Sequence, residues 1–170
     1  MTEPRLRPMT EDDLELVLKW RNAPPVRSFM LTQQEISLDD HRVWFASASR
    51  NSARALLVFE VGGEPLGHMN FKIDLSDEIA DWGFYAAPDA PRGTGRAMGS
   101  KALEYGFTTL RLHKICGQVL DFNTASRKMH ETLGFRREGI LREQKQMNGV
   151  WRDLVCYGLL AQEWSAREGK

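Results

Sequence analysis

Several features that mark particular classes of protein are missing from this chain of 170 residues. No apolar run approaches the roughly 20 residues that a membrane-spanning helix needs, and the charged stretch from Met1 to Pro8 does not resemble a signal peptide. Neither sign of charge is in excess, because 23 basic residues balance 23 acidic ones. We therefore expect a soluble, cytoplasmic protein that binds neither nucleic acid nor a membrane surface.

Cysteine is scarce as well. The two cysteines, Cys116 and Cys156, each lie in an apolar stretch with the composition of a strand. Buried free thiols are the expected state of such residues, and a disulfide or a nucleophilic thiol would be the alternatives. We assign no metal site.

The residues that are present suit one folded domain of mixed α/β class, spanning residues 1–170. Hydrophobic residues make up 42% of the chain, and no repeat or long linker divides it. Thr10 and Asp13 have the spacing of a capping box, and Asn148-Gly149 is a strong hairpin signal. The pattern predicts a strand, two helices, three antiparallel strands, a helix, a strand, a helix and two strands, at about residues 5–8, 10–22, 37–49, 55–61, 66–73, 79–86, 96–110, 114–121, 124–133, 135–147 and 150–160.

The most informative segment lies between a predicted strand and a predicted helix and reads Arg92-Gly93-Thr94-Gly95-Arg96-Ala97. Glycines let the backbone approach a ligand closely, and the free N–H groups of a helix start attract anions. With Arg92 and Arg96 beside it, the turn suits a pyrophosphate. A Walker loop would need Gly-Lys-Ser/Thr, and the βαβ context of a dinucleotide fingerprint is absent. A structural turn with two solvated arginines is the alternative.

This segment resembles the Gln/Arg-x-x-Gly-x-Gly/Ala signature of the GNAT superfamily of N-acetyltransferases. A second stretch resembles that family's helix after the fifth strand and the strand beyond it, namely Asn123-x-x-Ser126, Leu133-Gly134-Phe135 and Glu138-Gly139. The resemblance implies a GNAT fold, in which a mostly antiparallel sheet splays between its fourth and fifth strands and is flanked by helices. It also implies acetyl-coenzyme A as the acetyl donor.

The resemblance assigns cofactor-binding residues. Backbone groups of Phe84, Tyr85 and Ala86 would bind the pantetheine arm. The loop residues Arg92, Gly93, Thr94, Gly95, Arg96 and Ala97 would hold the pyrophosphate, chiefly through the N–H groups of Gly93, Gly95, Arg96 and Ala97. Asn123 would bond the cofactor arm, cap its helix, or do both. Arg127 and Lys128 would meet the adenosine phosphates, or else form a solvated helix face with Arg127 paired to Glu131.

The implied reaction is the attack of an amine on a thioester, with one proton leaving the amine and one reaching the sulfur. His130 stands where the family usually has a Tyr that protonates the thiolate, so it is our candidate acid, with a water as the alternative. Asp81 is a candidate base. Neighbours on a strand face opposite sides, and we place Trp82 in the acceptor pocket, with the amine losing its proton to a water held by Asn70.

The acceptor is predicted from the region of the first two helices. This region contains Trp20-Arg21-Asn22, then Met30, then His41-x-x-Trp44-Phe45. These residues are similar to those of the sugar-nucleotide acetyltransferases of pseudaminic acid biosynthesis, which acetylate the 4-amino group of a UDP-linked dideoxy amino sugar. The predicted acceptor-binding residues are Arg21, Asn22, Met30, His41, Trp44, Trp82 and Gln118. Leu31 and Gln118 depart from that subfamily's usual Tyr and Glu.

Two other functions stay open. The chain also resembles acetyltransferases that act on the N-termini of ribosomal proteins, and His130 in place of Tyr leaves room for a non-catalytic module that binds acyl-coenzyme A. We also consider a homodimer.

Overall fold

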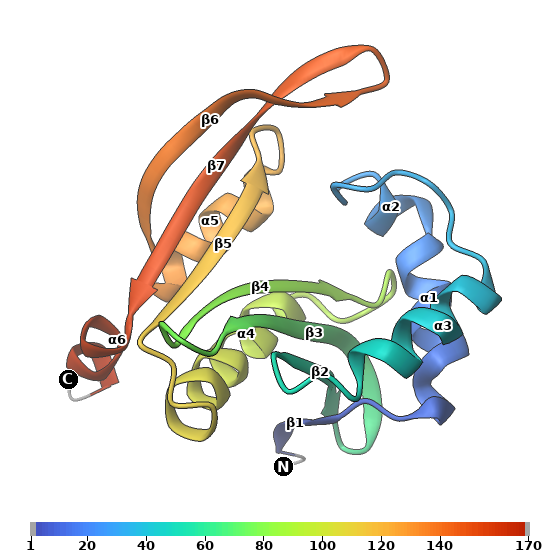
Figure 1. Ribbon diagram of the computed structural model, residues 1–170, viewed down its shortest axis with the longest axis horizontal. Coiled ribbons are helices and arrows are strands. Elements are labelled where there is room, and N and C mark those ends of the chain that lie inside the picture. The colour runs from blue at the N-terminus through green and yellow to red at the C-terminus, as the bar shows by residue number, and fades with distance from the viewer. Residues whose placement is uncertain (1–2, 169–170) are drawn as a thin grey trace.

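The computed structural model describes residues 3–168, which form one seven-stranded sheet with helices on both faces (Figure 1). The strands lie in the order β1-β2-β3-β4-β5-β7-β6, and every neighbouring pair is antiparallel except the parallel pair β4–β5. Their bounds are β1 Pro4–Pro8, β2 Arg54–Val61, β3 Glu64–Asp74, β4 Ile79–Ala86, β5 Lys114–Leu120, β6 Arg136–Met147 and β7 Val150–Leu160. The predicted mixed α/β sheet of GNAT type is confirmed.

The helices also follow the predicted order, with additions. Their bounds are η1 Glu11–Asp13, α1 Leu14–Asn22, α2 Pro24–Arg27, α3 Leu38–Ala48, α4 Thr94–Glu104, η2 Tyr105–Thr109, α5 Thr124–Leu133 and α6 Ala161–Glu168. Sequence analysis missed α2, which is a single turn started by two prolines, and α6, which follows β7 without any linker. The predicted helix that ends near Leu110 changes from α to π geometry at Tyr105.

Each face of the sheet has its own apolar core. On the face covered by α4 and α5, the buried side chains include Phe71, Met98 and Ile115, none of which is exposed. On the face covered by α1 and α3, the core includes Trp20 and Phe45. Burial of these side chains is the main force that holds the helices against the sheet.

The sheet is divided at the junction of β4 and β5. These strands pair only from Ile79 to Asp81, opposite Lys114 to Cys116. Beyond this point β5 continues along β7, whereas β4 stays with β3, so the two strands diverge (Figure 1). The expected splay between the fourth and fifth strands is confirmed.

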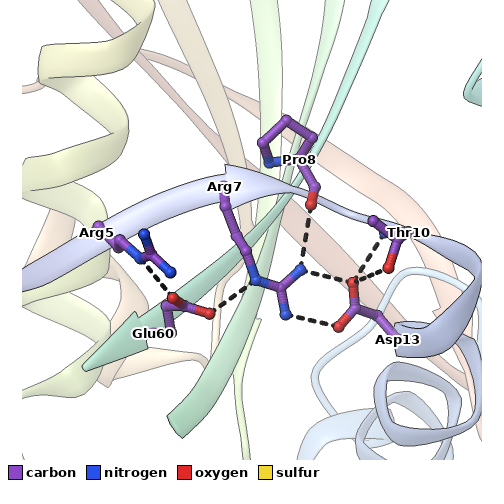
Figure 2. A network of polar contacts seen from close by, with 6 residues as sticks. All are labelled: Arg5, Arg7, Pro8, Thr10, Asp13 and Glu60. Atoms are coloured by element: carbon purple, nitrogen blue, oxygen red, sulfur yellow. Dashed lines mark hydrogen bonds and ion pairs between the residues drawn. The ribbon is translucent and has the colours of Figure 1, made fainter. Parts of the chain in front are cut away.

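A buried ion network fastens β1 to the rest of the molecule (Figure 2). Arg7 donates two bonds to the Asp13 carboxylate, at 2.7 and 2.8 Å, and its Nε donates to Glu60 on β2 at 2.7 Å. Arg5 donates to the other oxygen of Glu60. Asp13 also accepts from the N–H of Thr10 at 2.8 Å, so the predicted capping contact is present. The pKa values of Asp13 and Glu60 are held below their usual ranges, chiefly by hydrogen bonds from Arg7.

Among residues 3–168, no helix is both long enough and apolar enough to cross a membrane. Cys116 and Cys156 are free thiols, as expected, but each is half-buried rather than buried. Burial is nevertheless the main cause that raises the pKa of both thiols, which disfavours a reactive thiolate.

Candidate active site between β4 and β5

A cavity of about 700 Å³ occupies the gap between the diverging strands. Its size is typical of sites that bind small ligands. Residues from α2 and the loop after it form one wall, and the other walls come from β4, β5 and α5. The lining residues are Pro25, Val26, Phe29, Met30, Leu31, Lys72, Asp81, Trp82, Gly83, Phe84, Tyr85, Ala86, Ala87, Pro88, Gly117, Gln118, Val119, Leu120, Asn123, Ser126 and His130.

The alternation of side chains along β4 gives this cavity two sides. Trp82 and Phe84 point to the face covered by α4 and α5, where they join the core. Asp81 lies on the opposite face, beside Lys72 of β3 in the strand register. Both Asp81 and Trp82 therefore line the cavity, but from opposite faces of the sheet.

Trp82 lines the cavity, as we expected, but its ring is packed into the core. Its side chain is only 7% exposed and packs against three rings, those of Phe84, His130 and Phe135, with centroids 4.8–5.5 Å away. A ring packed in this way presents little surface for stacking on an acceptor. The polar residue that faces the acceptor side of β4 is instead Asp81, which is exposed.

His130 lies at the cavity, as its position on α5 led us to expect, but both of its ring nitrogens are occupied. The indole N–H of Trp82 donates to Nε2 at 3.0 Å, and Nδ1 lies 2.8 Å from the carbonyl oxygen of Ser126. Indole nitrogen is only a donor, so Nε2 must be the acceptor, and the proton of the neutral ring sits on Nδ1. Burial also lowers the pKa of His130 below the usual value of a histidine. This arrangement does not support the expected role of His130 as an imidazolium acid.

Asn70 is not among the described residues that line the cavity. Its Nδ2 donates to the carbonyl oxygen of Gly83 on β4 at 3.1 Å. The residue thus supports β4 at the point where the strand has left β5. A water held by Asn70 stays a prediction.

The start of α4 has the geometry of an anion site. Gly93 caps the helix with φ of 94°, a left-handed conformation that favours glycine. Within residues 3–168, the N–H groups of Gly93, Gly95 and Arg96 have no hydrogen-bond acceptor. Arg92 and Arg96 are exposed beside them, and the helix dipole adds positive potential.

Two residues of the predicted loop have other roles. The N–H of Ala97 donates to the carbonyl oxygen of Gly93 at 3.0 Å, so it is not the free donor that we expected. Thr94 is buried, and its hydroxyl donates to the carbonyl oxygen of Pro91 at 2.7 Å. Both residues shape the turn, which leaves Gly93, Gly95 and Arg96 to offer N–H groups.

The first turns of α5 carry the remaining predicted cofactor residues. Oδ1 of Asn123 accepts from the N–H of Ser126 at 3.2 Å, which confirms the predicted helix cap, and Asn123 also lines the cavity. Arg127 donates to the carbonyl oxygen of Asp121 at 3.1 Å, and Glu131 accepts from Tyr157 instead of pairing with Arg127. Lys128 is exposed on the same helix. Contacts of these residues with a cofactor stay predictions.

The predicted acceptor residues divide into two groups. Met30, Trp82 and Gln118 line the cavity, whereas Arg21, Asn22, His41 and Trp44 do not, as far as the described chain shows. Arg21 is buried, and its Nη2 donates to the carbonyl oxygen of Thr32 at 2.8 Å. The amide of Asn22 forms two bonds with the backbone of Ile36, at 2.8 and 2.9 Å. Arg21 and Asn22 therefore position the loop after α2 rather than point into the cavity.

His41 and Trp44 belong to an aromatic cluster beneath that wall. His41 stacks on Trp44 with centroids 5.1 Å apart, and His68 packs against Tyr85 at 5.3 Å. Burial lowers the pKa of His41, and it lowers that of His68 to about 4. Burial also raises the pKa of Tyr85, so these rings are neutral at pH 7.

Sequence reasoning missed several wall residues. Pro25, Val26 and Phe29 were not proposed because a single turn started by two prolines gives no periodic signal. Lys72 was missed because its position beside Asp81 depends on the register of β3 and β4. Gly117 carries a sequence signal that could have been used, since a glycine inside a predicted strand often marks a close approach of another group.

Comparisons with known proteins agree with this geometry. A family model described as an acetyltransferase (GNAT) domain matches residues 5–136. The chain belongs to the GNAT acetyltransferase family. Members of this family transfer the acetyl group of acetyl-coenzyme A, so acetyl-coenzyme A is the donor and the chain is an N-acetyltransferase.

Individual relatives differ in their acceptors. A crystal structure of spermidine N-acetyltransferase from Vibrio cholerae in complex with coenzyme A and spermine superimposes with a TM-score of 0.90 at 25% identity, covering 95% of this chain and 98% of that one. Acetyltransferase PseH from Campylobacter jejuni is 23% identical over 72% of this chain and 76% of its own. The putative ribosomal N-acetyltransferase YdaF from Bacillus subtilis is 29% identical over 81% and 74%.

Proposed function

We propose that this N-acetyltransferase acetylates the 4-amino group of a UDP-linked dideoxy amino sugar. The observation that carries the proposal is the charge of the acceptor side of the cavity. Among the lining residues of the described chain, Asp81 is the single carboxylate, and Lys72 lies beside it. The adjacent wall is apolar, with Pro25, Phe29 and Met30 in it. The apolar wall suits the methyl-bearing face of a deoxy sugar and the ring of a base. The single carboxylate suits an acceptor that carries a single amine.

A polyamine acceptor suits this surface less well. Spermidine carries several positive charges at neutral pH, and a site that selects it needs more than one carboxylate to balance them. Here one carboxylate is offset by Lys72. The similarity to a spermidine acetyltransferase covers almost the whole chain, so spermidine is the comparison that the experiment must include.

The donor fits the residues on the other side of the gap. The N–H groups of Gly93, Gly95 and Arg96 would hold the pyrophosphate, with Arg92 adding charge. A Cβ added at Gly95 meets no atom within 4 Å, so this turn is open to a ligand. Backbone groups of Phe84, Tyr85 and Ala86 on the β5 side would orient the pantetheine arm, because β4 has no strand partner there.

The donor supplies an activated thioester. The reaction with an amine then requires two proton transfers. The walls hold the amine against the thioester and exclude most water, which can account for much of the rate. Asp81 is the residue of the wall that can accept a proton from the amine, directly or through a water. The amine loses one proton and the sulfur of coenzyme A gains one, so no other co-reactant is needed.

An acceptor panel tests the proposal. Release of the coenzyme A thiol would be followed with a UDP-linked 4-amino-4,6-dideoxy sugar, spermidine, and a peptide with the N-terminus of a ribosomal protein. We expect the sugar nucleotide to have a kcat/KM at least tenfold above the others. A preference for spermidine or for the peptide would overturn the sugar assignment. Binding of acetyl-coenzyme A by calorimetry without turnover of any amine would indicate a non-catalytic module.

Asp81→Asn is the matched variant for this panel. It keeps the shape of the wall and removes the proton acceptor. We expect its kcat/KM for the sugar nucleotide to fall by roughly 10²-fold or more, while the affinity for acetyl-coenzyme A stays within about twofold. Asp77→Asn makes the same chemical change in the exposed turn between β3 and β4, outside the cavity lining, and should change neither value.

A further inference from the structure

We propose that Trp82, His130 and Gly117 act together as a wedge that sets the gap between β4 and β5, and that His130 positions the Trp82 indole instead of donating a proton. The wedge is defined here as these three residues. The inference rests on one part of the proposed function, namely that an acyl donor binds in the gap. It does not depend on which acceptor is used.

The wedge stands where the two strands part. β4 and β5 pair at three positions, the last being Asp81 with Cys116. The next pair in this register would join Trp82 to Gly117. There the strands separate, and the indole and imidazole lie directly over the glycine.

Gly117 leaves the room that the two rings need. A Cβ at this position would lie 2.5 Å from Nε2 of His130 and 2.9 Å from Nε1 of Trp82. Both distances are below any normal contact of carbon with nitrogen, and both atoms belong to the same hydrogen bond. A side chain here would therefore break that bond or displace β5.

The hydrogen bonds fix the orientation of both rings. Nε1 of Trp82 donates to Nε2 of His130 at 3.0 Å, and Nδ1 of His130 donates to the carbonyl oxygen of Ser126 at 2.8 Å. The chain of donors and acceptors thus begins on β4 and ends on the backbone of α5. Because a protonated Nε2 would face a second N–H, protonation would break the bond to Trp82.

The rings packed around His130 bury it and so favour its neutral form, whereas the bond from Nδ1 to the Ser126 carbonyl on its own helix acts in the opposite direction and is the smaller effect. Trp82 and Phe84 face it from β4, Phe135 from the residue before β6, and Tyr157 stacks on it from β7 at 5.0 Å. An acidic group bonds to this stack through Tyr157, since Glu131 accepts from the Tyr157 hydroxyl at 3.2 Å. His130 is 2% exposed, and no carboxylate in the described chain bonds to its ring.

The protonation state of His130 is directly measurable. In the wild-type protein labelled with ¹⁵N, we expect the His130 nitrogens to show the neutral form protonated on Nδ1 at pH 7, with any titration midpoint below the 6.5 of a free histidine. Trp82→Phe keeps a ring and removes the N–H, so Nε2 would be freed and the pKa of His130 should rise. A residue with only a packing role would not show this shift. A wild-type His130 that titrates near 6.5 would overturn the proposal.

Binding and kinetics test the wedge itself. Gly117→Ala should weaken acetyl-coenzyme A binding at least tenfold by calorimetry, whereas Gly139→Ala, where a Cβ meets no atom within 4 Å, should leave it unchanged. His130→Gln can still accept from the Trp82 N–H, and it should keep far more kcat than His130→Leu. Normal binding by a folded Gly117→Ala protein, as judged by circular dichroism, would reject the wedge. If Gly117→Ala does not fold, the comparison of His130→Gln with His130→Leu still decides.

The pH profile separates this role from acid catalysis. We expect kcat to show no falling limb with a histidine pKa as pH rises from 6 to 8. A limb that is present in the wild type and vanishes in His130→Gln would restore His130 as the acid. The nuclear magnetic resonance and calorimetric results need no acceptor. They can therefore support the wedge even when the acceptor panel rejects the sugar nucleotide. The acceptor panel can likewise support the sugar nucleotide when these results reject the wedge.

Discussion

Gly95 lies in the first turn of α4, where an added Cβ would meet no atom within 4 Å. Gly95→Asp should therefore fold normally and yet place a negative charge beside the expected pyrophosphate. We expect the Kd for acetyl-coenzyme A to rise at least tenfold, about 1.4 kcal/mol, as measured by calorimetry.

Two control variants separate the causes. Gly95→Asn adds nearly the same volume without the charge, and it should cost less affinity than Gly95→Asp. Gly139→Asp adds the same charge on β6, where a Cβ likewise meets nothing within 4 Å, and it should have little effect. If Gly139→Asp weakens binding as much as Gly95→Asp does, the anion site is not at the start of α4.

For single residues, sequence reasoning identified positions better than roles. Asn123 and His130 were placed correctly at the cavity because the motif fixes their spacing on α5. The role of His130 was not predictable, because it depends on a hydrogen bond from Trp82, which is 48 positions earlier in the chain. Arg21 was interpreted as an acceptor-binding residue because its region resembles the sugar-nucleotide acetyltransferases, but its guanidinium donates to the backbone carbonyl of Thr32.

The buried ion network adds to the strand pairing that attaches β1 to β2, and it also joins β1 to η1. Arg7→Met would remove the guanidinium that bonds to both Asp13 and Glu60, and these carboxylates are only 7% and 3% exposed. We expect the free energy of unfolding in urea to fall by roughly 2–3 kcal/mol, because the buried carboxylate of Asp13 would lose its ionic partner and that of Glu60 would keep only Arg5.

Arg5→Met is the matched control for that variant. Arg5 also bonds to Glu60, but its side chain is 68% exposed. We expect a loss below about 1 kcal/mol, as for other exposed ion pairs. Equal losses in both variants would mean that burial does not decide the contribution of this network.

The elements themselves were largely predictable, because periodicity and turn residues are local signals. Asn148-Gly149 correctly indicated the hairpin of β6 and β7. The position of β7 between β5 and β6 was not predicted, since strand order depends on contacts far apart in sequence. The short α2 was missed for another reason, because a single turn started by two prolines gives no periodic signal, although it supplies part of one wall of the cavity.

Three of the four histidines, His41, His68 and His130, are buried, and burial lowers the pKa of each. The pKa of His68 falls to about 4, whereas an unfolded histidine titrates near 6.5. Below pH 6.5 the unfolded chain therefore binds protons that the native protein does not. We expect the free energy of unfolding to fall as pH drops from 6.5 toward 4, by up to about 1.4 kcal/mol per pH unit for each such group.

Urea unfolding at pH 7.5 and pH 5 measures this loss. His68→Gln removes one titrating group and should reduce the difference between the two pH values. His113 is exposed, so His113→Gln should leave that difference unchanged. A wild-type protein that is equally stable at both pH values would contradict the expectation, since the buried rings would then accept protons without cost.

The short pairing of β4 with β5 has a consequence for aggregation. Beyond Asp81, β4 carries the unpaired backbone groups of an edge strand although it lies in the middle of the sheet. Exposed edges of this kind pair readily with extended segments of other proteins. Here the edge lies along a cavity whose other walls come from α2, β5 and α5. An extended segment of another protein could therefore pair with β4 only by entering this cavity, which makes the edge harder to reach than one at the rim of the sheet.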